Sequence, residues 1–152
     1  MQDSVFVTLS EPLKYGDNQS TDKVEIRCPS FGDTRDRKYY RHLQSMMANV
    51  IREMSGSTGD GANDVATDPT DVKVSSKELI FMLMISMGGD GYHDEVERFM
   101  ARADRCCFLN DASPLKSGPA SRIHPDDQAH LFGSYLENFT LPGLMSLMTG
   151  KN

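Results

Sequence analysis

Histidines, cysteines and carboxylates are the side chains most able to do chemistry, and in this 152-residue chain they do not form a known metal-binding pattern. Cys106 and Cys107 are adjacent, so on a helix they would point to different faces, and His124 and His130 are six residues apart. Zinc sites usually draw their ligands from closely spaced pairs such as C-x₂-C and H-x₃-H. We therefore expect no metal site and no cofactor.

Two other stretches resemble ligand-binding loops only superficially. An EF-hand loop places oxygen ligands at alternate positions and a glycine at the sixth. Counted from Asp60 the sixth residue is Val65, and counted from Asp90 it is Glu95, so neither stretch fits. The glycines of MGGDGYH match neither G-x-x-x-x-G-K-[ST] nor G-x-G-x-x-G, the two phosphate-binding patterns. Nothing in the sequence gives positive support to an enzyme, and we expect none.

One cluster of basic side chains could bind a polyanion. It lies on the polar side of a helix expected from Asp33 or Thr34, and consists of Arg35, Arg37, Lys38, Arg41 and Arg52. Such a face can contact nucleic-acid phosphates, meet an acidic protein, or simply be solvated. Because Asp33, Asp36 and Glu53 partly offset these charges, we favour the solvated face. Nucleic acid is not an expected partner.

A single apolar run, Leu79–Ile85, is the stretch around which the other elements must be arranged. Ser75 and Glu78 precede it with the spacing of a capping box, and glycines at 88 and 89 follow it, as they follow a helix end. These signals predict a helix over 74–87, although a short apolar run is also compatible with a buried strand. A helix that is apolar on every side has to be enclosed by the rest of the chain or by a partner.

Two alternating segments near the amino terminus predict a β-hairpin. Residues 5–10 and 24–28 alternate apolar and other side chains, which is the period of a strand with one buried face. The stretch between them, EPLKYGDNQSTD, is rich in turn-forming residues and predicts a long loop at the hairpin tip. Two strands alone are marginal in water, so the hairpin must lean on helices or on another chain.

Helical periodicity accounts for most of the remaining chain. Apolar residues recur at three- and four-residue steps over about 34–54, 92–106 and 125–139, and a short helix is expected over 144–148. Residues 55–73 are small, polar and acidic, and they predict a flexible linker because such a segment cannot offset the entropy of ordering it.

The predicted fold is α+β and mainly α: an N-terminal β-hairpin followed by a bundle of four to five helices. Residues 1–54 carry the hairpin and an amphipathic helix, and residues 55–73 form the acidic linker. Residues 74–152 form the helical part, which we expect to make one domain with 1–54.

Ten methionines and no tryptophan are an unusual composition. Methionine adapts to irregular surfaces, so methionine-rich stretches can form a binding face, although they fill hydrophobic cores more often. Met82 and Met84 are among the methionines that could face a partner, but we favour the core for both. Our hypothesis for the partner-binding residues is the set Met46, Met47, Val50, Met54, Leu144, Met145, Leu147 and Met148.

The segment VFVTLSEPL, followed by a polar tip and KVEIRCPSFGD, resembles the tail assembly chaperones of long-tailed phages. That family has a strand of the form V-x-L-x-x-P-[IL] and a second strand that ends near R-x-P-x-x-x-D. The second half of this chain is similar to the family only in its helical pattern. The matching positions are Val7, Leu9, Pro12 and Leu13, then Arg27, Pro29 and Asp33.

The resemblance implies a protein without catalytic activity that acts in the host cytoplasm and is not expected in the mature virion. It would coat the tape-measure protein, recruit tail-tube subunits and self-associate. We expect no membrane span, because crossing a bilayer takes about 20 apolar residues. Two other classes stay open: a virion structural protein of the neck, tube or connector, and a small nucleic-acid-binding phage regulator.

Overall fold

The alternating residues at the amino terminus form two long antiparallel strands, β1 (Ser4–Gly16) and β2 (Gln19–Arg27). The computed structural model describes residues 4–28, 32–57, 76–110, 112–142 and 144. The predicted hairpin is confirmed, but its long tip is wrong, because pairing continues to Gly16↔Gln19. Asn18 closes the turn with φ 63, a left-handed conformation that asparagine tolerates better than most residues.

The hairpin remains paired near its tip because side chains beyond the expected strand ends are buried. Leu13 and Thr21 face each other across the strands at 3% and 5% exposure. The register shifts between Thr8 and Leu13, a stretch that includes Pro12. Proline lacks the N–H that a strand ladder needs, so an irregularity is the physical consequence of its presence there.

A third strand, β3 (Cys107–Phe108), completes the sheet in the order β1-β2-β3. It pairs antiparallel with β2 through Glu25↔Phe108 and Ile26↔Cys107. The sequence predicted helix up to Cys106 and no strand after it. Helical structure instead ends at Ala101, and the short 3-10 turn η3 (Ala103–Arg105) leads the chain into the sheet.

Two long helices follow the predicted apolar stripes. Helix α1 (Thr34–Ser57) begins where Asp33 accepts a hydrogen bond from the backbone N–H of Arg35, 2.7 Å away. Helix α2 (Ser76–Ala101) is interrupted at Gly88, which has φ 75 and ψ 165. The predicted helix and its break are both confirmed, and the alternative of a buried strand is wrong.

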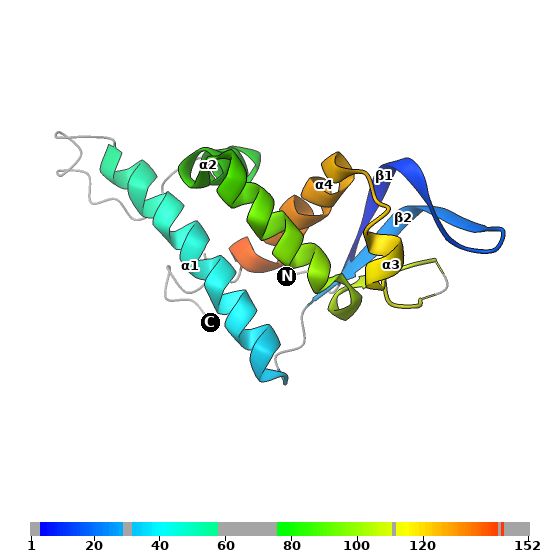
Figure 1. Cartoon of the computed structure of the whole chain (residues 1–152). Helices are drawn as coiled ribbons and strands as arrows, with labels where there is room; N and C mark the ends of the chain where they lie inside the picture. Colours follow the sequence, from blue (N-terminus) through cyan, green and yellow to red (C-terminus); the bar gives the residue numbers. More distant parts are fainter. Residues whose placement is uncertain (1–3, 29–31, 58–75, 111, 143, 145–152) are drawn as a thin grey trace.

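The carboxyl-terminal part contributes α3 (Ser117–Ala120), α4 (Pro125–Tyr135) and a π-helical turn, η4 (Leu136–Thr140). Pro125 opens α4 as predicted, and the short α3 lies in a stretch that the sequence predicted to be loop. Figure 1 shows α1, α2 and α4 next to one another, with the hairpin beyond α4 and α3.

The α+β class is confirmed, whereas a bundle of four to five helices is not. In the described part of the chain α3 has only four residues, and α2 is kinked rather than straight. Helix α1 includes residues 55–57 of the expected linker, and the rest of that linker, together with residues 145–148 of the expected last helix, lies outside the described residues.

One hydrophobic core joins these elements. Its cluster includes Val24 of the hairpin, Leu43 of α1, Phe99 of α2 and Phe132 of α4, all without exposed surface. The rings of Phe99 and Phe132 lie 5.5 Å apart between centroids, so aromatic packing fastens α2 to α4. Among the described residues, no helix is both long and apolar enough to span a membrane.

Candidate functional site

An apolar groove of about 390 Å³ lies on the surface between α2 and α4. On α2, it is lined by Ile80, Phe81, Met84 and Tyr92. Its volume lies within the range of about 300–1,000 Å³ that is typical of ligand-binding pockets. We call this feature the α2–α4 groove.

Large apolar side chains are exposed along the α2 wall of this groove. Phe81 is 59% exposed, Met84 is 41% exposed and Ile85, beside them on the same helix, is 58% exposed. Leu79 and Leu83 face the core instead, at 7% and 1% exposure. The helix is therefore enclosed on one side only, and the predicted core position of Met84 is wrong.

The physical reason is that the run is apolar around the whole helix, while the chain covers one face of it. Met82 is half-buried and packs against the core, in partial agreement with its predicted place. Exposed apolar side chains that are contiguous on one face indicate an interaction surface more strongly than scattered ones do.

Helix α4 and the first residues of η4 supply the other side of the groove, which we call the α4 side, with one face of small and polar residues. They recur at three- and four-residue steps and comprise Asp126, Ala129, His130, Gly133, Ser134 and Glu137. At Gly133 the two helices come close, since a Cβ added there would lie 4.0 Å from Cδ1 of Ile80. Glycine and alanine in the middle of this face leave room that larger side chains would fill.

The two ends of the α4 face are acidic. Asp126 is in the first turn of α4 with its side chain 92% exposed, and Glu137 is exposed in η4, just after the end of α4. Asp126 lies 3.9 Å from Nδ1 of His124, which is a weak contact, and no lysine or arginine lines the groove within the described part of the chain. The groove is therefore apolar at its centre and negatively charged at its ends.

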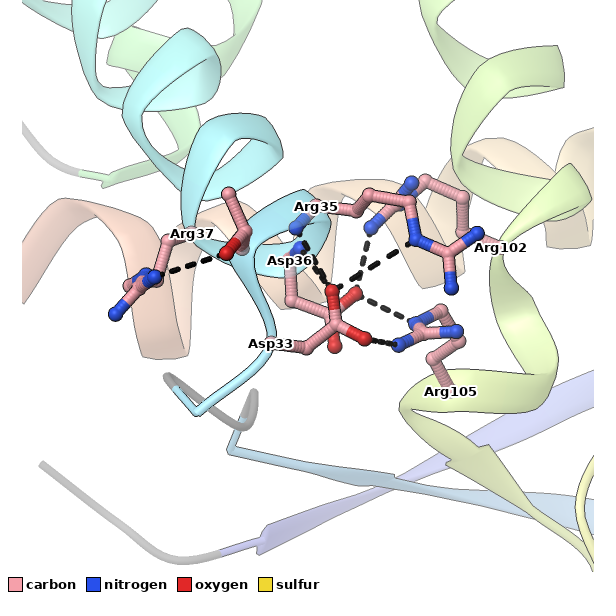
Figure 2. Close-up of polar contacts among 7 residues, drawn as sticks. Asp33, Arg35, Asp36, Arg37, Arg102 and Arg105 are labelled. Carbon is pink, nitrogen blue, oxygen red and sulfur yellow. Dashed lines mark hydrogen bonds and ion pairs between the residues drawn. The ribbon is translucent and has the colours of Figure 1, made fainter.

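A cluster of ion pairs joins the start of α1 to Arg102 and Arg105, which follow the end of α2 (Figure 2). Asp36 Oδ1 accepts from Arg102 Nη2 and from Arg105 Nε, both at 2.6 Å, and Asp33 Oδ2 accepts from Arg105 Nη2, also at 2.6 Å. The backbone N–H of Arg35 lowers the pKa of the Asp33 carboxyl, and hydrogen bonding to Asp36 raises the pKa of Arg105. These ion pairs connect the start of α1 to the segment that follows α2.

This cluster changes the electrostatics of the predicted basic face. Arg35, Arg37, Lys38, Arg41 and Arg52 are all exposed on α1. Arg37 donates to Oγ1 of Thr34 at 3.0 Å, and Arg35 remains 3.8 Å from Asp33 (Figure 2). Because Asp36 faces Arg102 and Arg105, it offsets the face less than the sequence suggested.

A small cavity of about 20 Å³ lies behind that cluster, between Tyr39, Arg102, Cys106 and Tyr135. The Tyr39 hydroxyl is buried and has no hydrogen-bond partner among the described residues, and burial raises the pKa of Tyr39. A cavity of this size has room for about one water molecule and none for an organic substrate. It is a packing feature rather than a binding site.

Sequence reasoning missed a contact between histidine and carboxylate. His42 Nε2 lies 3.0 Å from Oε1 of the buried Glu95, and Arg98 donates to the same oxygen at 3.3 Å. The two residues lie on different helices, so no local spacing could have revealed the pair. It lies outside the residues that line the α2–α4 groove, and it serves to connect α1 to α2.

The described residues contain no group of three or more histidine, cysteine, aspartate or glutamate side chains placed to hold a metal ion. Cys106 and Cys107 are free thiols with sulfurs 3.9 Å apart, and their mutual hydrogen bond, with burial, raises the pKa of the Cys107 thiol. A raised thiol pKa disfavours the reactive thiolate.

The predicted partner-binding residues are placed mostly inward where the structure describes them. Met47, Val50 and Leu144 are buried, at 0%, 2% and 6% exposure, and Met46 is half-buried against the core. The side chains of Met54, Met145, Leu147 and Met148 lie outside the described residues. Their partner-binding role stays a prediction. Of the exposed apolar residues of α2, the sequence analysis considered Met84 as partner-facing but preferred the core, and did not consider Phe81 or Ile85.

No protein-family model, curated protein or solved structure matches this chain.

Proposed function

We propose that this protein is a non-enzymatic tail assembly chaperone of a long-tailed phage, which binds the tape-measure protein and tail-tube subunits in the host cytoplasm. The observation that carries the proposal is the exposed apolar wall of the α2–α4 groove, formed by Phe81 and Met84. A chaperone of this kind keeps a long helical protein soluble by covering its apolar stripes, and therefore needs an adaptable apolar surface of its own.

The amino-terminal pattern gives the proposal its direction. The residues that resemble the family lie on β1, at the end of β2 and directly before α1, and Pro29 lies outside the described residues. Their roles in this fold are structural: Val7, Leu9 and Leu13 are buried, and Asp33 caps α1. The residues of the pattern therefore support the fold, and the α2–α4 groove is the surface that we propose binds the partner.

Co-expression tests the proposal directly. The tagged full-length chain is produced together with the tape-measure protein of the same phage, and the two are purified through the tag. A chaperone keeps the tape-measure protein in the soluble fraction and co-purifies with it. Failure of both, with a folded chain and a tape-measure protein that aggregates as it does alone, would contradict the proposal.

A structural protein of the virion is separated from a chaperone by its place in the finished particle. Mass spectrometry of purified virions is expected to find this chain absent or far below the tube subunit. Stoichiometric amounts in the particle would favour the neck, tube or connector.

The exposed basic face of α1 supports the second candidate, a small nucleic-acid-binding regulator. Its signature is binding to duplex DNA or RNA that weakens steeply with salt, because such binding releases counterions. The double variant Arg37→Glu with Arg41→Glu abolishes that binding if the regulator is the correct class. Unchanged co-purification of the tape-measure protein in the same variant supports the chaperone.

A further inference from the structure

We propose that the α2–α4 groove binds one amphipathic α-helix whose apolar face lies against α2 and whose ends carry lysine or arginine. The inference deepens the proposed chaperone function and rests on it for the identity of the partner, since it states which segments of a long helical protein this chain would select. It is argued from the length, the shape and the charge of the groove.

The length of the groove suits a short helical segment. Its α4 side runs from Asp126 to Glu137, which at the rise of an α-helix corresponds to about 17 Å, or about three turns. A helix that lies in a groove usually contacts it through residues at i, i+3 or i+4, and i+7, and these cover about two to three turns.

The shape of the groove allows a helix to approach closely. Ala129 and Gly133 occupy the middle of the α4 side, and Phe81 and Met84 stand along the α2 side. Small residues on one wall let a partner backbone come near, while the long apolar residues on the other wall cover its side chains. Methionine and phenylalanine contacts of this kind tolerate different partner sequences.

The charge of the groove selects the partner. Asp126 and Glu137 lie at the two ends of the α4 side, and among the described lining residues there is no lysine or arginine between them, although His130 is there. A helix with basic residues at both ends would place a cation near each carboxylate, whereas an acidic helix would meet repulsion at both. We therefore expect the groove to bind apolar helices with basic ends more tightly than apolar helices with acidic ends.

The basic face of α1 is not the helix that the groove would bind. Its exposed positions include Arg35, Arg37, Lys38 and Arg41, which match the charge of the groove ends. The exposed residues of this face are polar, and therefore lack the apolar anchors that the α2 side of the groove requires.

Peptide binding by the full-length chain tests the inference. The probe is a fluorescent helical peptide of about 18 residues, with leucines on one helical face and two lysines about 11 residues apart, the spacing of Asp126 and Glu137, and its counterpart carries glutamates in place of the lysines. We expect the lysine peptide to bind about tenfold more tightly at low salt, since two exposed ion pairs each add a few-fold. Equal binding of the two peptides overturns the inference.

Charge reversal at the ends of the groove locates the site. The double variant Glu137→Lys with Asp126→Asn is expected to prefer the glutamate peptide. The matched control, Asp22→Lys with Asp104→Asn, makes the same change in net charge at exposed positions that do not line the groove. It is expected to keep the preference for lysine. An identical effect of both double variants overturns the assignment to the groove.

Filling the groove tests its shape without removing any contact of the core. In Gly133→Leu the new side chain enters the groove, and leucine is the better helix former of the two, so the fold is expected to persist. Both peptides should then lose about tenfold or more in affinity, the order expected when an apolar anchor loses its pocket. Circular dichroism verifies folding, and Gly133→Ala, whose methyl group only reaches Ile80, serves as a milder step.

The same variants separate this inference from the proposed function. If the tape-measure protein still co-purifies with a folded Gly133→Leu chain, the chaperone function stands and the groove is not its site. If the unmodified chain binds the lysine peptide but never the tape-measure protein, the groove assignment stands and the chaperone function fails. A dimer in sedimentation that Phe81→Ser disrupts, together with no peptide binding, makes a second copy the occupant and overturns the inference.

Discussion

The carboxylate of Asp127 on α4 accepts hydrogen bonds from both the backbone N–H and the side-chain hydroxyl of Ser10 on β1. The two carboxylate oxygens of Asp127 lie 3.0 and 3.1 Å from the Ser10 backbone nitrogen, and one of them also accepts from the Ser10 hydroxyl at 3.0 Å. The residues are 117 positions apart, and Asp127 is only 5% exposed. The interaction satisfies the backbone of β1 where its pairing with β2 is irregular, and so attaches the hairpin to the helices.

Replacing Asp127 with alanine is expected to destabilise the fold by about 2–3 kcal/mol, because the N–H groups of Ser10 and Glu11 lose a charged acceptor. Urea unfolding followed by circular dichroism measures the change. The neighbouring Asp126→Ala is the control, since that side chain is 92% exposed and its loss should cost at most about 1 kcal/mol. Equal losses of unfolding free energy in the two variants would show that the hydrogen bonds of Asp127 to Ser10 and Glu11 do not contribute specially to stability.

Gly88 and Gly89 are adjacent, yet only Gly88 should resist substitution. Gly88 has φ 75 and ψ 165, a conformation nearly restricted to glycine, so Gly88→Ala is expected to cost about 1–3 kcal/mol. An added Cβ meets no atom within 4 Å at either position, so the cost at Gly88 arises from the backbone alone. Gly89→Ala is expected to be neutral or stabilising by up to about 1 kcal/mol. Thermal unfolding of the pair decides the point.

Asp33 should make the stability depend on pH in the acid range. Its pKa is lowered from 3.8 mainly by the backbone N–H of Arg35, so the unfolded chain takes up a proton at a higher pH than the folded chain does. The stabilisation is therefore complete above the ordinary pKa and is lost as pH falls through the lower, folded value. Asp33→Asn keeps a capping group but removes the charge.

In urea unfolding we expect the difference in stability between the native chain and Asp33→Asn to be constant from about pH 7 to 5. It should then shrink below about pH 4, where the native carboxylate becomes protonated. A difference that stays the same down to the most acidic conditions would show that the charge of Asp33 does not contribute.

Phe81 and Phe99 lie on the same helix and should respond oppositely to alanine. Phe99 has no exposed surface, so Phe99→Ala is expected to cost about 3–5 kcal/mol. Phe81 is 59% exposed, so Phe81→Ala is expected to change the stability by at most about 0.5 kcal/mol. Chemical denaturation measures both. A large loss at Phe81 would mean that the α2 wall is part of the core.

Phe6, which is 69% exposed on β1, is the control for the surface role of Phe81. Phe81→Ser is expected to reduce co-purification of the tape-measure protein, whereas Phe6→Ser, outside the α2–α4 groove, should leave it unchanged. If Phe6→Ser reduces co-purification and Phe81→Ser does not, the binding surface is on the hairpin.

The sequence alone determined the elements that depend on local pattern. Alternation placed the two strands, the three- and four-residue steps placed α1, and the flanking glycines placed the break of α2 at Gly88. The opening of α4 at Pro125 followed from the same local signals. Each of these depends on residues within a few positions of one another, so the information is complete in a short window.

Only the tertiary structure decided which apolar face of α2 is covered, where the strand β3 pairs, and that His42 meets Glu95. The run from Leu79 to Ile85 is apolar on every side, so its sequence carries no signal for the face that remains exposed. That choice is made by the residues of other elements that pack against Leu79 and Leu83, and these come from distant parts of the chain. The α2–α4 groove exists because packing covers one side of this helix and leaves Phe81, Met84 and Ile85 on the other.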